Sequence, residues 1–198
     1  MLKKLFFSSA ICISLILTVS QNSNAQAKTS DELKAERDAL KSEMQSSDAK
    51  KRDEKIEKMA SESPFVCEIS SLDGLASNSQ QILLATKSIN IQIPELYKRT
   101  IGETIDGVTD ITVKKPALDE LIVLAKTIAD QVTAVTNAVE TMKGAADEAK
   151  SAPMLAKAKA IKTLNFSKDA LALSGPELQL NLKVINNLIA TLKSANNN

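Results

Sequence analysis

The chain has 198 residues, with 25 Lys and Arg against 24 Asp and Glu, and it contains no histidine. Without histidine, Ser-His-Asp and Cys-His catalytic systems and histidine-ligated metal sites are excluded. The near-zero net charge argues against nucleic acid as the main partner, because phosphate binding needs a basic surplus. An aromatic content of 3% and only five glycines favour helices over a sheet.

Residues 1–27 have the features of a cleavable signal peptide. Two lysines precede an apolar run over residues 5–19, and the segment ends in Ala25-Gln26-Ala27. We expect cleavage after Ala27, with cleavage after Ala25 as the alternative, and export to the periplasm or the exterior. An uncleaved N-terminal anchor is the other interpretation. Cleavage removes two lysines and no acidic residue, which changes the net charge from +1 to −1.

Residues 28–62 form a highly charged segment with few apolar positions. Thr29 and Glu32 have the spacing of a helix-capping box. The segment predicts a solvated helix, and two interpretations remain for it. It is either a projecting coiled-coil arm that joins two copies through residues 30–60, or a surface helix that packs on the body of the protein.

The segment from Pro64 to Ile93 has apolar residues at helical spacing and predicts a helix that Pro94 ends or kinks. Residues 89–93 also alternate as in a short strand, so that alternative stays open. Cys67 is the only cysteine after the leader. We interpret it as a buried apolar side chain at a helix start, with an intermolecular disulfide as the alternative.

Residues 102–115 interrupt the helical pattern. Gly102 and Asp106-Gly107 are turn signals, and branched apolar residues give 105–113 some strand character. The segment is either an ordered connector or a binding loop. The spacing of Asp106 and Asp110 does not match a calcium loop.

A seven-residue apolar repeat runs through Pro116–Lys150 and predicts a long helix. Pro116 suits the first helical turn, and Gly144 falls on the outer face. Ile122 and Leu124 widen the apolar stripe beyond a two-stranded seam. We therefore expect this segment to be the central helix of an intramolecular bundle, buried most deeply near its N-terminal end.

The remaining chain predicts two further helices, over residues 153–173 and after Ser174-Gly175-Pro176. Residues 178–184 alternate between apolar and polar, so a strand is the alternative there. All five prolines are interpreted as breaks between elements. The prediction is an all-α protein, in which residues 63–198 form an antiparallel bundle of four or five helices and residues 28–62 form the charged helix.

The sequence offers no residue for a catalytic, cofactor or metal site, since phosphate-loop motifs are absent and adjacent carboxylates fall on polar helix faces. We expect an exported, non-enzymatic protein with a protein-interaction or structural role in the cell envelope. A functional surface is expected on residues 31–60 or 102–115. One alternative is a membrane-active, pore-forming protein, although residues 28–198 contain no second apolar run of spanning length. Another is a carrier of an apolar ligand in the bundle core.

Overall fold

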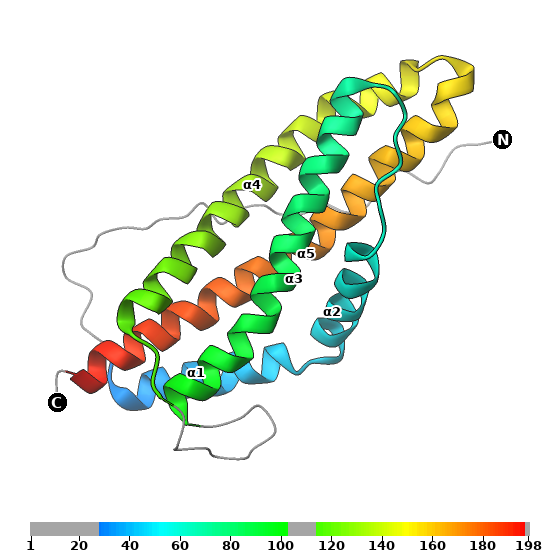
Figure 1. The fold of residues 1–198 in the computed structure, drawn as a ribbon. Helices are drawn as coiled ribbons and strands as arrows, with labels where there is room; N and C mark the ends of the chain where they lie inside the picture. The colour runs from blue at the N-terminus through cyan, green and yellow to red at the C-terminus, as the bar shows by residue number, and fades with distance from the viewer. Residues whose placement is uncertain (1–27, 103–113, 197–198) are drawn as a thin grey trace.

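A computed structural model describes residues 28–102 and 114–196, which form five α-helices (Figure 1). The helices are α1 (Ser30–Met44), α2 (Ser47–Ala60), α3 (Ser70–Ile101), α4 (Leu118–Ser151) and α5 (Met154–Asn196). No strand occurs in these residues, which confirms the all-α prediction and makes 89–93 and 178–184 helical. The predicted leader and the strand-like part of the loop at 105–113 lie outside the described residues.

The long helices α3, α4 and α5 are each antiparallel to the next in sequence, running down, up and down in the view of Figure 1, and α5 is the central one. It contacts each of the other four helices, whereas α4 contacts only α3 and α5 among the described elements. The prediction that Pro116–Lys150 is the central helix is therefore wrong. The physical reason lies in side chains such as Val123, which are apolar but exposed. The larger buried residues of α4, Leu121 and Ile128, do lie toward its N-terminal end, as expected.

Two prolines lie inside helices, so the interpretation of all five prolines as breaks between elements is wrong. Pro94 lies within α3 and does not end it, and Pro176 lies within α5, which continues through Ser174-Gly175-Pro176. A proline removes one backbone hydrogen bond, but apolar side chains are buried on both sides of each position. Burial of these side chains outweighs the lost hydrogen bond. Burial also explains the strand-like alternation of residues 178–184. Its leucines are covered within a helix because several helices surround α5.

The charged segment forms two helices rather than one, and both lie on the body. Ser46 begins α2, where its hydroxyl accepts a hydrogen bond from Ala49 N at 3.1 Å. Leu40 of α1 belongs to the main core, and Ile56 of α2 packs with Leu83 and Ala170 in a smaller cluster. The apolar positions are thus used inside the chain, which matches the surface-packing interpretation and not a projecting arm. The predicted capping box at Thr29 is present.

Hydrogen bonds close both ends of α3. Before it, the Asp73 carboxylate accepts hydrogen bonds from Cys67 N at 2.8 Å and Glu68 N at 2.9 Å, and Cys67 is buried as predicted. After it, Gly102 takes a left-handed conformation with φ 77°, and its N–H donates to Lys98 O at 2.8 Å. These caps place the start of α3 beside the α4–α5 turn and its end beside the start of α4 (Figure 1).

Candidate functional site: the groove between α3 and α4

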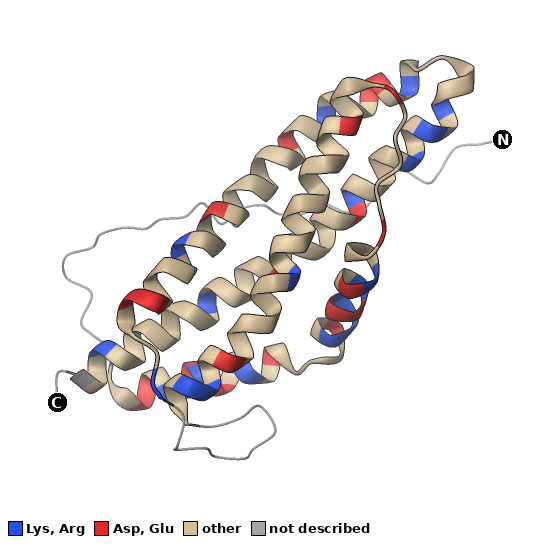
Figure 2. Cartoon of the chain, in the orientation of Figure 1, with Lys and Arg blue, Asp and Glu red and all other residues tan. Residues whose placement is uncertain are grey.

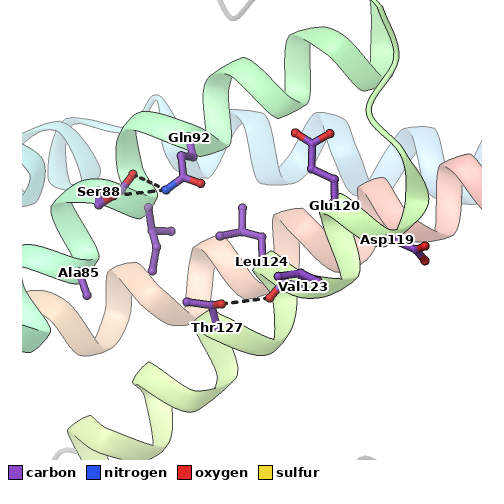
Figure 3. A pocket seen from close by; sticks show the side chains of 9 residues that line it. Ala85, Ser88, Gln92, Asp119, Glu120, Val123, Leu124 and Thr127 are labelled. Atoms are coloured by element: carbon purple, nitrogen blue, oxygen red, sulfur yellow. Dashed lines mark hydrogen bonds between the residues drawn. The ribbon is translucent and has the colours of Figure 1, made fainter.

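An open groove lies between α3 and α4, with α5 behind it (Figure 3). It has a volume of about 550 Å³. Its lining combines apolar residues in the middle with polar residues along the sides: Ala85, Ser88, Ile89, Gln92, Asp119, Glu120, Val123, Leu124 and Thr127. The sequence placed these residues on two separate helical faces and did not indicate that they meet.

The hydroxyl and amide groups beside the groove are bonded within their own helices. Gln92 Nε2 donates to Ser88 O at 3.2 Å and to Ser88 Oγ at 3.3 Å, and Thr127 Oγ1 donates to Val123 O at 3.1 Å (Figure 3). These groups therefore do not converge on a point in the groove, as the groups of a catalytic site would. The arrangement suits contact with an apolar face.

One end of the groove is acidic and anchored. The guanidinium of Arg99 binds Glu120 through two contacts, Nη1 to Oε1 at 2.7 Å and Nη2 to Oε2 at 3.1 Å, and its Nε donates to Lys114 O at 3.2 Å. These hydrogen bonds hold the pKa of Glu120 below its ordinary value. Glu120 is therefore an ionised structural anchor between α3 and α4, and the neighbouring Asp119 adds a second carboxylate at that end.

One large apolar side chain in the lining of the groove is exposed to solvent. Val123 on α4 lines the groove and has an exposed fraction of 65%. Leu84 and Ile91 on α3 are also exposed, but they do not line the groove. An exposed apolar side chain within a groove is consistent with an interaction surface.

A second polar constellation lies on the other side of α3, under α2. The Arg52 guanidinium binds Glu177, and Asn90 links α2 to α5 because it donates to Asp53 Oδ1 at 2.9 Å and accepts from Asn181 Nδ2 at 2.7 Å. Burial raises the pKa of Glu177, and the bond to Arg52 partly opposes that change. The Arg52–Glu177 pair and the Asp53–Asn90–Asn181 chain are two separate sets of contacts, and together they orient α2 on the body. Its signal in the sequence was the helical spacing of Glu177 and Asn181.

The sequence predicted a functional surface on residues 31–60 or on residues 102–115, and the structure bears on these two regions differently. Residues 31–60 expose charged side chains but use their apolar side in packing, and residues 103–113 lie outside the described part of the chain. The adjacent carboxylates serve in local contacts. Glu32 completes the first cap, Asp147 binds Lys150 at 2.8 Å, and Glu148 accepts a hydrogen bond from Ser71.

Within residues 28–102 and 114–196, no three His, Cys, Asp or Glu side chains gather as a metal site would require. None of the helices described there is both long and apolar enough to cross a membrane. Comparisons with protein-family models, with curated proteins and with solved structures give no match. The groove is therefore interpreted from its own shape and chemistry.

Proposed function

We propose that this chain is an exported, non-enzymatic helical-bundle protein that acts in the cell envelope by binding a protein partner in the α3–α4 groove. The observation that carries the proposal is the groove itself, with its apolar middle and with Val123 exposed in its lining. Burial of such side chains in an interface is favourable by about 25 cal/mol per Å² of apolar surface.

The occupant we propose is an amphipathic helix of the partner. Two antiparallel helices form a linear groove, and a third helix fits such a groove by placing residues at i, i+3, i+4 and i+7 along it. The lining that α3 contributes has the same spacing, at Ala85, Ser88, Ile89 and Gln92. The carboxylate of Asp119 favours a partner helix that carries a lysine or arginine at the corresponding end, whereas Glu120 is already paired with Arg99.

The export part of the proposal is supported by residues 1–27, with their basic start, apolar run and A-x-A end. N-terminal sequencing of the protein recovered outside the cytoplasm tests it. We expect the mature chain to begin at Lys28, or at Gln26 if cleavage follows Ala25. A chain that keeps Met1 after export would contradict the cleavable leader.

The groove is tested by charged substitutions in the mature protein. Ser88→Lys and Val123→Lys place an ammonium group in the lining of the groove, and Val66→Lys is the matched control because Val66 is 67% exposed on the linker before α3. We expect the same envelope protein to co-purify with the wild type and with Val66→Lys, and to be lost from both groove variants. Equal recovery from all four proteins would contradict the proposed groove function.

An apolar small molecule is the second candidate occupant. The volume of the groove, about 550 Å³, lies within the range of small-molecule sites. Binding of an apolar fluorescent dye distinguishes a small-molecule ligand from a partner helix as the occupant of the groove. Dye binding that Val123→Lys abolishes, without any protein partner that depends on the groove, would favour a carrier.

A further inference from the structure

The turn between α4 and α5 presents two large apolar side chains to solvent. The exposed fractions of Met154 and Leu155 are 92% and 96%, the highest of the exposed large apolar residues in the described part of the chain. They follow Pro153, whose carbonyl accepts hydrogen bonds from Ala156 N and Lys157 N at 2.9 Å. The first turn of α5 is thus a formed structure at the end of the bundle (Figure 1).

Alanines explain why these side chains point outward. Near the turn, α4 and α5 approach through Ala145, Ala149 and Ala160, all of which are buried in the main core. Close approach through such small residues leaves no interior space for a methionine or a leucine. The apex is therefore apolar because of how the two helices pack, and nothing else in the described chain covers it.

Lysines surround this apex. Residues 149–168 contain five lysines and no acidic residue: Lys150, Lys157, Lys159, Lys162 and Lys168. Figure 2 shows this basic colour along the first turns of α5. Of the nearest carboxylates on α4, Asp147 is bound to Lys150 and Glu148 to Ser71. Without residues 1–27 the chain has a net charge of −1. The α4–α5 turn therefore carries a local positive charge on a protein that is nearly neutral overall.

We propose that the α4–α5 turn docks on an anionic lipid bilayer, with Met154 and Leu155 inserted at the interface. The order of groups along α5 matches the order of layers in a bilayer. At roughly 1.5 Å per residue, Lys157 and Lys159 lie about 3–6 Å behind Leu155, within the headgroup layer that borders the hydrocarbon. Insertion of apolar side chains with lysines at headgroup level is the arrangement of interfacial membrane binding.

A bilayer fits this apex better than an acidic protein surface does. Met154 and Leu155 project from a convex end, whereas the core of a protein–protein interface usually needs a concave complement around such residues. The site is also independent of the groove. Val123 and Ser151 lie 28 residues apart on α4, or about 40 Å along the helix, so both sites can be occupied together.

Vesicle sedimentation tests the proposal with the protein that begins at Lys28, so that the leader does not contribute. Vesicles of phosphatidylcholine with about one third phosphatidylglycerol are compared with pure phosphatidylcholine, since anionic lipid attracts juxtamembrane lysines. We expect sedimentation with the anionic vesicles only. Met154→Ser with Leu155→Ser should lower the partition coefficient at least tenfold, and Lys157→Gln with Lys159→Gln about 25-fold, at roughly fivefold per lysine.

The matched control for charge is Lys55→Gln with Lys58→Gln on the exposed face of α2, which should bind as the wild type does. Depth is tested with Leu155→Trp and Val123→Trp, because the chain has no other tryptophan. Brominated acyl chains should quench only the tryptophan at 155. No sedimentation with anionic vesicles, binding that the apex variants leave unchanged, equal binding to neutral vesicles, or quenching at neither position would overturn the proposal. The substitutions at Met154, Leu155, Lys157 and Lys159 leave the groove unchanged, so their effects on vesicle binding are separate from the results that test partner binding.

Discussion

Arg52 Nε lies 3.1 Å from Glu177 Oε2, and this ion pair joins the charged helix α2 to the middle of α5. The Glu177 residue is only 7% exposed. A carboxylate in that position loses most of its hydration, which raises its pKa, and the guanidinium supplies the compensating contact. The highly charged N-terminal segment is therefore part of the folded body and neutralises a charge that the body buries.

Replacing Arg52 by an uncharged residue should destabilise the protein more than replacing Glu177 by its amide. We expect Arg52→Met to lower the free energy of unfolding by about 1–3 kcal/mol at neutral pH, because it leaves a buried carboxylate without a partner. Glu177→Gln should change it by less than about 1 kcal/mol, since the amide still accepts from Arg52. The double variant should recover most of the loss. Urea unfolding of the four proteins gives the comparison.

The same pair predicts a pH dependence. Because the pKa of Glu177 is raised by folding, at pH values between its unfolded and folded pKa the folded protein holds a proton that the unfolded chain has already lost. The contribution of Glu177 to stability therefore rises as the pH falls through that pKa, and declines above it. The deficit of Arg52→Met should shrink on acidification when measured against wild type. A deficit that stays constant down to acidic pH would contradict the assignment of the buried charge.

Alanine substitutions of three glycines should have opposite effects. A Cβ atom at Gly74 or at Gly144 would meet no atom within 4 Å, so Gly74→Ala and Gly144→Ala should each stabilise the protein by about 1 kcal/mol. Gly102 has φ 77°, a conformation that alanine adopts at a loss, so Gly102→Ala should destabilise it by about 1 kcal/mol. Thermal unfolding followed by circular dichroism measures all three. Destabilisation by Gly144→Ala would mean that α4 has a partner on that outer face.

The packing of α2 predicts the effect of a core truncation. Ile56 is fully buried against Leu83 and Ala170, and Ile56→Ala should therefore lower stability by about 2–4 kcal/mol. Ile91→Ala, at an exposed apolar site, is the control and should have little effect on the free protein. Sedimentation should give the same mass for wild type and Ile56→Ala. A lower mass without lost stability would instead support the oligomerising arm.

The buried thiol of Cys67 predicts the behaviour of the protein without reductant. Its Sγ lies 3.3 Å from Asp73 Oδ1, inside the turn that starts α3. We expect a single monomer band on a non-reducing gel and slow labelling by a thiol reagent until the protein is unfolded. A reductant-sensitive dimer would restore the intermolecular disulfide as the correct interpretation.

Local signals in the sequence were sufficient for the fold class and for several helix ends. The capping box at Thr29 and Glu32 depends on only four consecutive residues, and the structure confirms it. The apolar repeat of Pro116–Lys150 likewise corresponds to α4, at Leu118–Ser151. Such features depend on neighbours along the chain, which a sequence displays directly.

Features that depend on distant contacts were not predictable in the same way. Pro176 signals a break locally, yet α5 continues because helices on several sides bury the residues around it. Glu177 and Asn181 are polar but buried, so the sequence of α5 gives the impression of a helix that is less buried than α4. The groove was missed because it arises from the relative positions of α3 and α4, and neither apolar face alone specifies that arrangement.

The most direct measurement of the proposed function is site-specific photocrosslinking in intact cells. A photoreactive residue is placed at Ser88 on α3, at Val123 on α4, or at Lys55 on the exposed face of α2. The proposed groove predicts a crosslink from Ser88 and Val123 to the same protein, and none to that protein from Lys55. Crosslinks to that protein from all three positions, or none from the two groove positions, would contradict the proposal.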